Sequence, residues 1–177
     1  SKRISKNQMR INVVIPTRGI VFTEVEMALE AMRQTHAIDV YYSINLPIPD
    51  AQNETTIEAL KNNPDYILFI EEDTIPTPDA LNKLIAVDAD IAFIDYGVNG
   101  WSCSAKLEGS NEILWCGLGC TLVKQEVFNK MLYPYFRTDK TLRLNDWSWR
   151  DNPAKYGGQD IWFCMEARRL GFKLKQV

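Results

Sequence analysis

Histidine is almost missing from this sequence, because His36 is the only one among its 177 residues. The four cysteines, Cys103, Cys116, Cys120 and Cys164, contain no CxxC pair. A structural zinc site needs four such ligands in close spacing, so we expect none. A cysteine–histidine nucleophile would have to use His36, which has no neighbour suited to orient it. The simplest interpretation is free, mostly buried thiols in a reducing, cytoplasmic setting.

Long apolar runs are missing as well. No segment approaches the roughly 20 apolar residues of a membrane helix, and the N-terminus lacks the apolar centre of a secretory signal. The net charge of −3 argues against a broad basic face for nucleic acid. The one strongly basic stretch, residues 1–10, predicts a frayed, solvated end. We therefore expect no membrane span and no nucleic-acid partner.

The apolar segments alternate between two periodicities. Short runs rich in β-branched residues predict buried strands, and segments with apolar residues three or four apart predict helices. The predicted strands are residues 11–16, 39–45, 66–70, 91–96 and one or two within 113–123. The predicted helices are residues 23–34, with Thr23 as N-cap, 51–62, 79–86, 124–132 and 159–170, with Gly171 as C-cap. This order is typical of an α/β domain with a mostly parallel sheet covered by helices on both faces.

Three consecutive carboxylates, Glu71, Glu72 and Asp73, follow the most apolar strand. Such charges repel one another beside a core unless something compensates them, and a divalent cation would do so. Mn²⁺ and Mg²⁺ favour oxygen ligands and commonly bridge one or two carboxylates to substrate phosphates. Glu71 and Asp73 would share one face of an extended segment. The alternative is a solvated strand end with a helix-capping acid.

Five segments resemble, in the same order, the GT-A fold glycosyltransferases of the family-2-like group. The carboxylate segment resembles the surroundings of that group's DxD motif, with Glu-Glu-Asp in its place. The others resemble the nucleotide-contacting first strand, the helix that lies between this strand and the DxD motif, the Gly-x-Gly pocket segment and the segment that carries the general base. The matching stretches are INVVIPTRG (11–19), AQNETTIEAL (51–60), DYILFIEEDTIPTPDALNKL (65–84), WCGLGCTLVKQEVFNKM (115–131) and YGGQDIWFCMEARRLGFKL (156–174).

The resemblance implies one catalytic domain over residues 1–177, with a nucleotide-binding half (1–100) and an acceptor half (101–177). It implies inverting, metal-dependent transfer of a sugar from a UDP- or GDP-sugar to an acceptor hydroxyl that the sequence does not identify. Asp160 matches the general base, and Glu71 and Asp73 match the ligands of Mn²⁺ or Mg²⁺. The residues expected at the nucleotide are Pro16, Thr17, Arg18, Asn53, Glu72 and Asp73.

Several positions depart from the family pattern. Gln52 replaces an arginine, Gln159 replaces a glutamate, and Glu71 is longer than the usual aspartate. A histidine that often ligates the metal would fall beyond Val177, so either the sequence continues or the site lacks this ligand. A non-catalytic binding module with this fold is therefore one alternative. A sugar nucleotidyltransferase is another, although the loop at residues 16–19 is too short to cradle a triphosphate.

The second half contains further candidates. Residues 133–155 show little periodicity and predict a long loop that closes over the donor. Its arginines, Arg137, Arg143 and Arg150, are candidates for diphosphate contacts. The tryptophans Trp101, Trp147 and Trp149 either stack on sugar rings or pack within the protein. Gly117 and Gly119 indicate a tight turn or a close backbone approach rather than a dinucleotide fingerprint.

Overall fold

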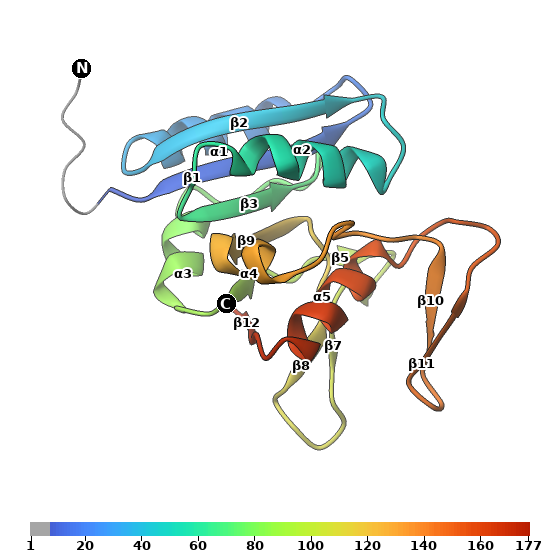
Figure 1. Ribbon diagram of the computed structural model, residues 1–177. Helices are drawn as coiled ribbons and strands as arrows, with labels where there is room; N and C mark the ends of the chain where they lie inside the picture. The colour runs from blue at the N-terminus through green and yellow to red at the C-terminus, as the bar shows by residue number, and fades with distance from the viewer. Residues whose placement is uncertain (1–7) are drawn as a thin grey trace.

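The computed structural model describes residues 8–177, so most of the predicted frayed end lies outside the described residues. A six-stranded sheet forms the centre of the molecule, in the order β12-β4-β9-β3-β1-β2 (Figure 1). Five strands point the same way, and β9 runs antiparallel to both neighbours. The prediction of a mostly parallel α/β sheet is confirmed. The strands are β1 (Arg10–Thr17), β2 (Ala37–Ile44), β3 (Tyr66–Ile70), β4 (Ile91–Phe93), β9 (Cys120–Lys124) and β12 (Leu174–Gln176).

Helices cover both faces of this sheet. One core layer contains residues of α2, α4 and α5, and the other contains residues of α1 and α3. The sheet alternation explains the division, because Ile67 and Phe69 of β3 belong to the first layer and Leu68 and Ile70 to the second. A strand buried on both faces is apolar throughout. The helices are α1 (Thr23–Arg33), α2 (Asp50–Leu60), α3 (Ala80–Ala86), α4 (Gln125–Lys130) and α5 (Gln159–Arg169).

The segment at residues 133–155 is more regular than predicted. It contains a hairpin of β10 (Lys140–Arg143) and β11 (Ser148–Asp151), which stands beside α5 (Figure 1). The hairpin forms its own two-stranded sheet, apart from the central one. Neither of its faces is fully buried, so its sequence shows only weak alternation of apolar and polar residues. Shorter strands complete two further ribbons: β5 (Gly97–Val98) with β6 (Trp101–Ser102), and β7 (Ala105–Lys106) with β8 (Ile113–Trp115).

The helix ends agree with the predictions in part. Gly171 has a φ of 93°, the left-handed conformation expected directly after α5. Thr23 was wrongly predicted as the N-cap of α1, because the helix begins at Thr23 and Phe22 occupies the cap position. None of the helices within residues 8–177 is long and apolar enough to cross a membrane.

Candidate functional site

A pocket of about 320 Å³ lies at the carboxyl ends of β1 and β3. This is the edge at which open parallel α/β sheets bind ligands. Six of the residues predicted at the site line it, namely Pro16, Thr17, Arg18, Glu71, Glu72 and Asp73. The remaining wall comes from the loop after β2 with Leu46 and Ile48, from α2 with Gln52 and from α5 with Gln159. The structure therefore brings residues from the ends of five elements, β1, β2, β3, α2 and α5, together around the predicted carboxylates.

Glu72 joins the ends of β1 and β3. Its carboxylate accepts hydrogen bonds from the Thr17 hydroxyl at 2.7 Å and from the Arg18 amide at 2.8 Å, and it pairs with the Arg18 guanidinium. Burial acts to raise the pKa of Glu72, but these hydrogen bonds and the charge of Arg18 outweigh it and lower the pKa. Glu72 thus stays ionised and holds the loop after β1 in place.

Glu71 lies in a different electrostatic environment. Burial raises the pKa of Glu71 most, and the charge of Asp73 raises it further. A hydrogen bond from Tyr96 opposes these effects, and the charge of Asp160 and a hydrogen bond from Thr74 make smaller contributions of opposite sign. Burial also raises the pKa of Asp160. Within residues 8–177, none of the ion pairs includes Glu71, Asp73 or Asp160. These three carboxyl groups therefore have no cationic partner among the described residues.

The geometry of the carboxylate segment differs from the extended one predicted. The Thr74 amide donates to the Glu71 carbonyl at 3.2 Å, so the chain turns directly after β3. Alternation along a strand therefore does not relate Glu71 to Asp73, and the turn brings their charges together instead. Among the described residues, no three His, Cys, Asp or Glu side chains meet closely enough to hold a metal ion by themselves.

Tyr96 was missed by the sequence analysis. Its hydroxyl donates to Glu71 Oε1 at 3.3 Å, and burial followed by the charge of Glu71 raises its pKa. The ring lies against Gly117 and Gly119, where a Cβ would come within 2.5 Å of Tyr96 Oη and of its Cε1, respectively. The close backbone approach predicted for these glycines is thus an approach to a tyrosine ring. Two glycines spaced two apart were the only signal for it.

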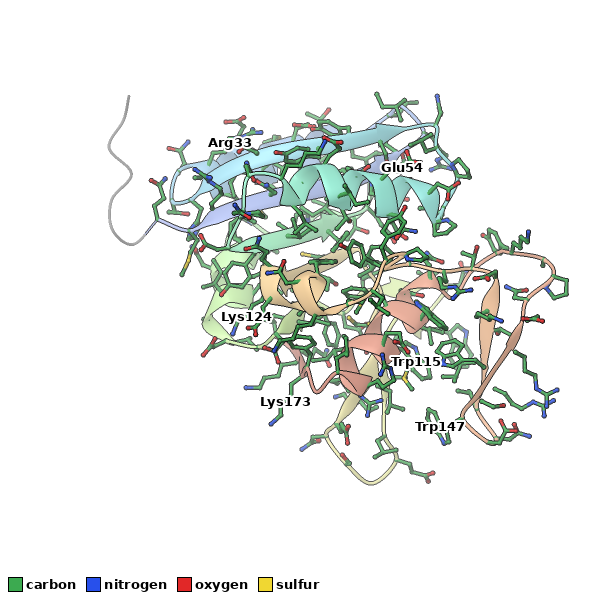
Figure 2. The ribbon with its side chains drawn as sticks, in the orientation of Figure 1. Arg33, Glu54, Trp115, Lys124, Trp147 and Lys173 are labelled. Atoms are coloured by element: carbon green, nitrogen blue, oxygen red, sulfur yellow. The ribbon has the colours of Figure 1, made fainter. Side chains whose placement is uncertain are left out.

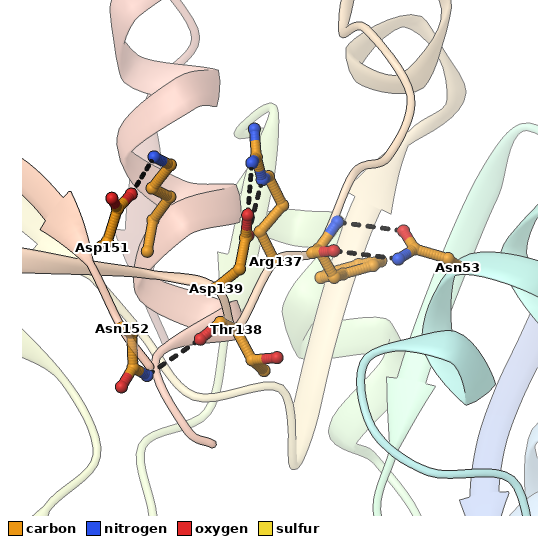
Figure 3. Close-up of polar contacts among 8 residues, drawn as sticks. Asn53, Arg137, Thr138, Asp139, Asp151 and Asn152 are labelled. Carbon is orange, nitrogen blue, oxygen red and sulfur yellow. Dashed lines mark hydrogen bonds and ion pairs between the residues drawn. The ribbon is translucent and has the colours of Figure 1, made fainter. Parts of the chain in front are cut away.

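Asn53 does not line the pocket. Its side-chain amide donates to the Phe136 carbonyl at 2.9 Å, and its carbonyl accepts from the Phe136 amide at 3.0 Å (Figure 3). Both functional ends of this buried side chain are used inside the protein, so the prediction that Asn53 contacts the nucleotide is not supported by its position. Its neighbour Gln52 lines the pocket instead, and the Gln52 Oε1 has no hydrogen-bond partner among the described residues.

The first turn of α5 carries the predicted base. Asp160 is half-buried and its Oδ1 accepts from the Ile161 amide at 2.9 Å. Asp160 itself is not part of the pocket wall, but the adjacent Gln159 is, and the Gln159 Oε1 has no partner within the described residues. The charge of Asp160 makes a smaller contribution to the raised pKa of Glu71.

The arginines of residues 133–155 take no part in this pocket. Arg137 binds Asp139 through two nitrogens, at 2.8 and 2.6 Å (Figure 3). Its guanidinium also lies over the Trp162 ring. Arg143 pairs with Asp146 at 3.7 Å, and Arg150 is exposed on β11. No part of the segment covers the pocket in this structure, so a lid over the donor has no support from the geometry.

Comparison with known proteins gives a likeness of fold. No protein-family model and no curated protein matches this sequence. Among solved structures, A197 from STIV superimposes with a TM-score of 0.63 at 16% sequence identity, covering 96% of this chain and 82% of that one. At this identity the match supports the mixed α/β architecture of the whole chain and carries no information on activity.

Proposed function

We propose that this chain is a GT-A-type glycosyltransferase that moves a sugar from a UDP- or GDP-sugar to an acceptor hydroxyl with the help of Mn²⁺ or Mg²⁺. One observation carries the proposal. The pocket at the ends of β1 and β3 combines a fixed loop, Thr17-Arg18, with the uncompensated carboxylates Glu71 and Asp73 and with the helix turn that carries Asp160. The five sequence segments that resemble the family lie on this framework in the same order.

The carboxylates fit a divalent cation. Glu71 and Asp73 repel each other and have no cationic partner among residues 8–177, which is the situation that a bound metal would relieve. Two carboxylates do not enclose an ion, but Mg²⁺ and Mn²⁺ typically take their other ligands from water and substrate phosphates. When bound, the metal would neutralise charge on the departing nucleoside diphosphate.

The rest of the pocket suits a nucleotide. Glu72 binds the Thr17 hydroxyl and the Arg18 guanidinium at the mouth of the pocket. The Arg18 side chain is 84% exposed, so a phosphate can reach its guanidinium from solvent. Leu46 and Ile48 provide an apolar wall for a base. Within residues 8–177 the amide oxygens of Gln52 and Gln159 have no hydrogen-bond partner, so they suit hydroxyl donors of a ligand, because a buried acceptor without a partner is costly.

Asp160 is the proposed general base. A carboxylate whose pKa is raised toward neutrality is a stronger proton acceptor while it remains ionised at the working pH. In the proposed step the acceptor oxygen attacks the anomeric carbon, its proton passes to an Asp160 carboxylate oxygen, and the bond to the nucleoside diphosphate breaks on the opposite face. This gives inversion. The buried, thiol-bearing core is compatible with the cytoplasmic location proposed from the sequence.

Calorimetry tests the proposal. UDP and GDP should bind with Mn²⁺ and lose most of their affinity with a chelator, and Asp73→Ala should abolish the metal-dependent part. Glu108→Ala, an exposed carboxylate between β7 and β8, is the matched control and should bind like the parent. Hydrolysis of UDP- or GDP-sugars then separates the alternatives. A binding module binds without turnover, and a sugar nucleotidyltransferase needs a sugar phosphate and a triphosphate. Equal binding by Asp73→Ala and the parent would refute the assigned ligands.

A further inference from the structure

The outer edge of the central sheet is formed by β2. In Figure 1 it is the outermost strand, and among the described residues it pairs with β1 alone. The Ala37 amide donates to the Met9 carbonyl at 3.0 Å and the Asn45 amide to the Thr17 carbonyl at 2.9 Å, so the odd-numbered residues of β2 bond to β1. The N–H and C=O groups of its even-numbered residues therefore point away from the sheet, where another strand can bond to them.

This edge lacks the features that usually prevent strand pairing. Lysine, proline, bulges and short length are the common protections of an outer strand. In contrast, β2 is eight residues long, pairs with β1 in an unbroken register and contains Asp39 as its one charged residue. Towards its end, Tyr42 and Ile44 are 41% and 61% exposed. The sequence and the geometry of β2 thus favour the addition of a further strand.

A groove of about 680 Å³ lies between β2 and α2. Figure 2 labels Glu54 on α2, on the side of the molecule that these two elements form. The apolar part of the groove is lined by Val40, Ile44, Leu46 and Ile57. Ser43 also lines it and is 5% exposed, and the Ser43 hydroxyl has no hydrogen-bond partner among the described residues. A buried hydroxyl without a partner costs stability, so the groove suits a ligand that supplies one.

The groove and its rim are acidic. Glu54 and Glu58 line the groove, and Asp39 shares the face of β2 with Ser43. Glu58 pairs with Lys61 at 2.6 Å, whereas none of the ion pairs within residues 8–177 includes Asp39 or Glu54. A basic side chain of a partner would therefore meet two unpaired carboxylates.

A second copy of this chain fits the edge poorly. Antiparallel pairing of two β2 strands about a two-fold axis would keep both α2 helices on one face of the joined sheet. Asp39, Glu54 and Glu58 of the two copies would then face one another, and like charges across neighbouring strands are destabilising. The occupant that this edge favours therefore has the opposite charge.

We propose that β2 binds an extended, basic segment of another protein as an additional strand of the sheet. Backbone hydrogen bonds to the even-numbered residues of β2 provide affinity, and alternate side chains provide specificity. Lysine or arginine side chains on the α2 face approach Asp39 and Glu54, and apolar side chains on the other face cover Tyr42 and Ile44. This interaction surface does not depend on the proposed sugar transfer.

Amide hydrogen exchange tests the strand addition, with a short, end-capped peptide of alternating lysine and valine as the probe. At a peptide concentration about ten times its dissociation constant, exchange of the Val40 and Tyr42 amides should slow about tenfold. The Tyr41 amide, which points to β1, should not change. The N–H groups of a strand alternate between its two edges. Methylating the valine nitrogens or the lysine nitrogens of the peptide should therefore abolish binding in one case and spare it in the other.

Charge variants give a matched comparison. Glu54→Lys should weaken binding of the lysine–valine peptide about fivefold or more, because an attraction becomes a repulsion. Glu108→Lys makes the same change in net charge at an exposed position outside the groove, and it should bind the peptide like the parent. Melting curves followed by circular dichroism check that both variants are folded.

Several results would each overturn the inference. They are no binding of the lysine–valine peptide, equal binding of a glutamate–valine peptide, equal weakening by Glu54→Lys and Glu108→Lys, and binding that leaves exchange at Val40 and Tyr42 unchanged. A concentration-dependent dimer in sedimentation, with these two amides protected in the absence of peptide, would assign the edge to a second copy instead.

Discussion

The charged side chains are arranged differently in the pocket at the ends of β1 and β3 and in the β10–β11 hairpin. In the hairpin region each aspartate forms an ion pair with a basic side chain: Asp139 with Arg137, Asp151 with Lys140 and Asp146 with Arg143. At the pocket, Glu71 and Asp73 in the wall and Asp160 beside it have no such partner among the described residues, whereas Glu72 is paired with Arg18. Paired charges can be explained by structure alone. Glu71 and Asp160 are partly buried as well as unpaired, which costs stability and therefore points to a ligand, whereas Asp73 is exposed.

Asp160→Asn is the largest expected effect on the pocket side of this comparison. Asparagine keeps the size and much of the helix-capping ability of aspartate but cannot accept the acceptor's proton. We expect kcat to fall by about two orders of magnitude or more, with binding of UDP–Mn²⁺ unchanged. Single-turnover transfer and calorimetry on the same preparation measure both quantities.

The matched control is Asp139→Asn in the hairpin, where the same change removes a partner of Arg137. It should leave kcat close to that of the parent. A folded Asp160→Asn protein that binds donor and transfers sugar at the parent rate would reduce Asp160 to a helix cap. The comparison between paired and unpaired carboxylates would then lose its functional meaning.

The sequence predicted the sheet, its helices and most of the pocket, because these depend on periodicity and on strand ends. Strand 66–70 was predicted with its observed bounds, and six predicted site residues line one pocket. Asn53 was beyond such reasoning, since its partner Phe136 lies 83 residues away. The hairpin was missed for a related reason. Among the described residues β10 and β11 pair with each other and not with the central sheet. Their residues are half-buried or exposed, so the sequence lacks the alternation of apolar and polar residues that marks a core strand.

Asn53→Ala separates a structural amide from a ligand contact. The substitution leaves the Phe136 N–H and C=O without partners in a buried region, which should destabilise the fold by about 3 kcal/mol. Urea unfolding measures this loss. Gln52→Ala, one residue earlier, should cost much less stability, because its Oε1 has no partner to lose. It should weaken nucleotide binding instead, and the reverse pattern would restore Asn53 to the ligand site.

Gly119→Ala tests the contact between the glycine segment and Tyr96. The new Cβ would lie 2.5 Å from the Tyr96 ring, and we expect a destabilisation of roughly 1–3 kcal/mol, typical of overpacking. Tyr96→Phe removes only the hydroxyl that donates to Glu71, so it should cost less stability and weaken Mn²⁺–nucleotide binding. Thermal melts and calorimetry distinguish the two. Full tolerance of Gly119→Ala would mean that the ring does not occupy this space.

The smallest expected effects concern how the stability of the protein depends on pH, and they compare the unpaired Glu71 with the paired Asp139 directly. The folded pKa of Glu71 lies above its ordinary value of 4.5, so the folded state holds the proton more tightly than the unfolded state does. The stability contributed by this group therefore falls as the pH rises from about 4.5 through the folded pKa. Glu71→Gln removes this loss. In metal-free buffer near neutral pH, we expect it to unfold at the same temperature as the parent or at a higher one.

The pKa of Asp139 is shifted in the opposite direction to that of Glu71. The Arg137 side chain lowers the pKa of Asp139, so its stabilisation is present above its ordinary value of 3.8 and is lost as the pH falls through the folded pKa. Because Asp139 is 44% exposed, solvent screening limits the cost of Asp139→Asn to at most about 1 kcal/mol near neutral pH. Mn²⁺ with UDP should then raise the melting temperature of the parent and of Asp139→Asn, but hardly that of Glu71→Gln. If Glu71→Gln is less stable than Asp139→Asn in metal-free buffer, other groups in the protein must stabilise the charge of Glu71. The argument that a bound cation compensates the pocket carboxylates would then fail.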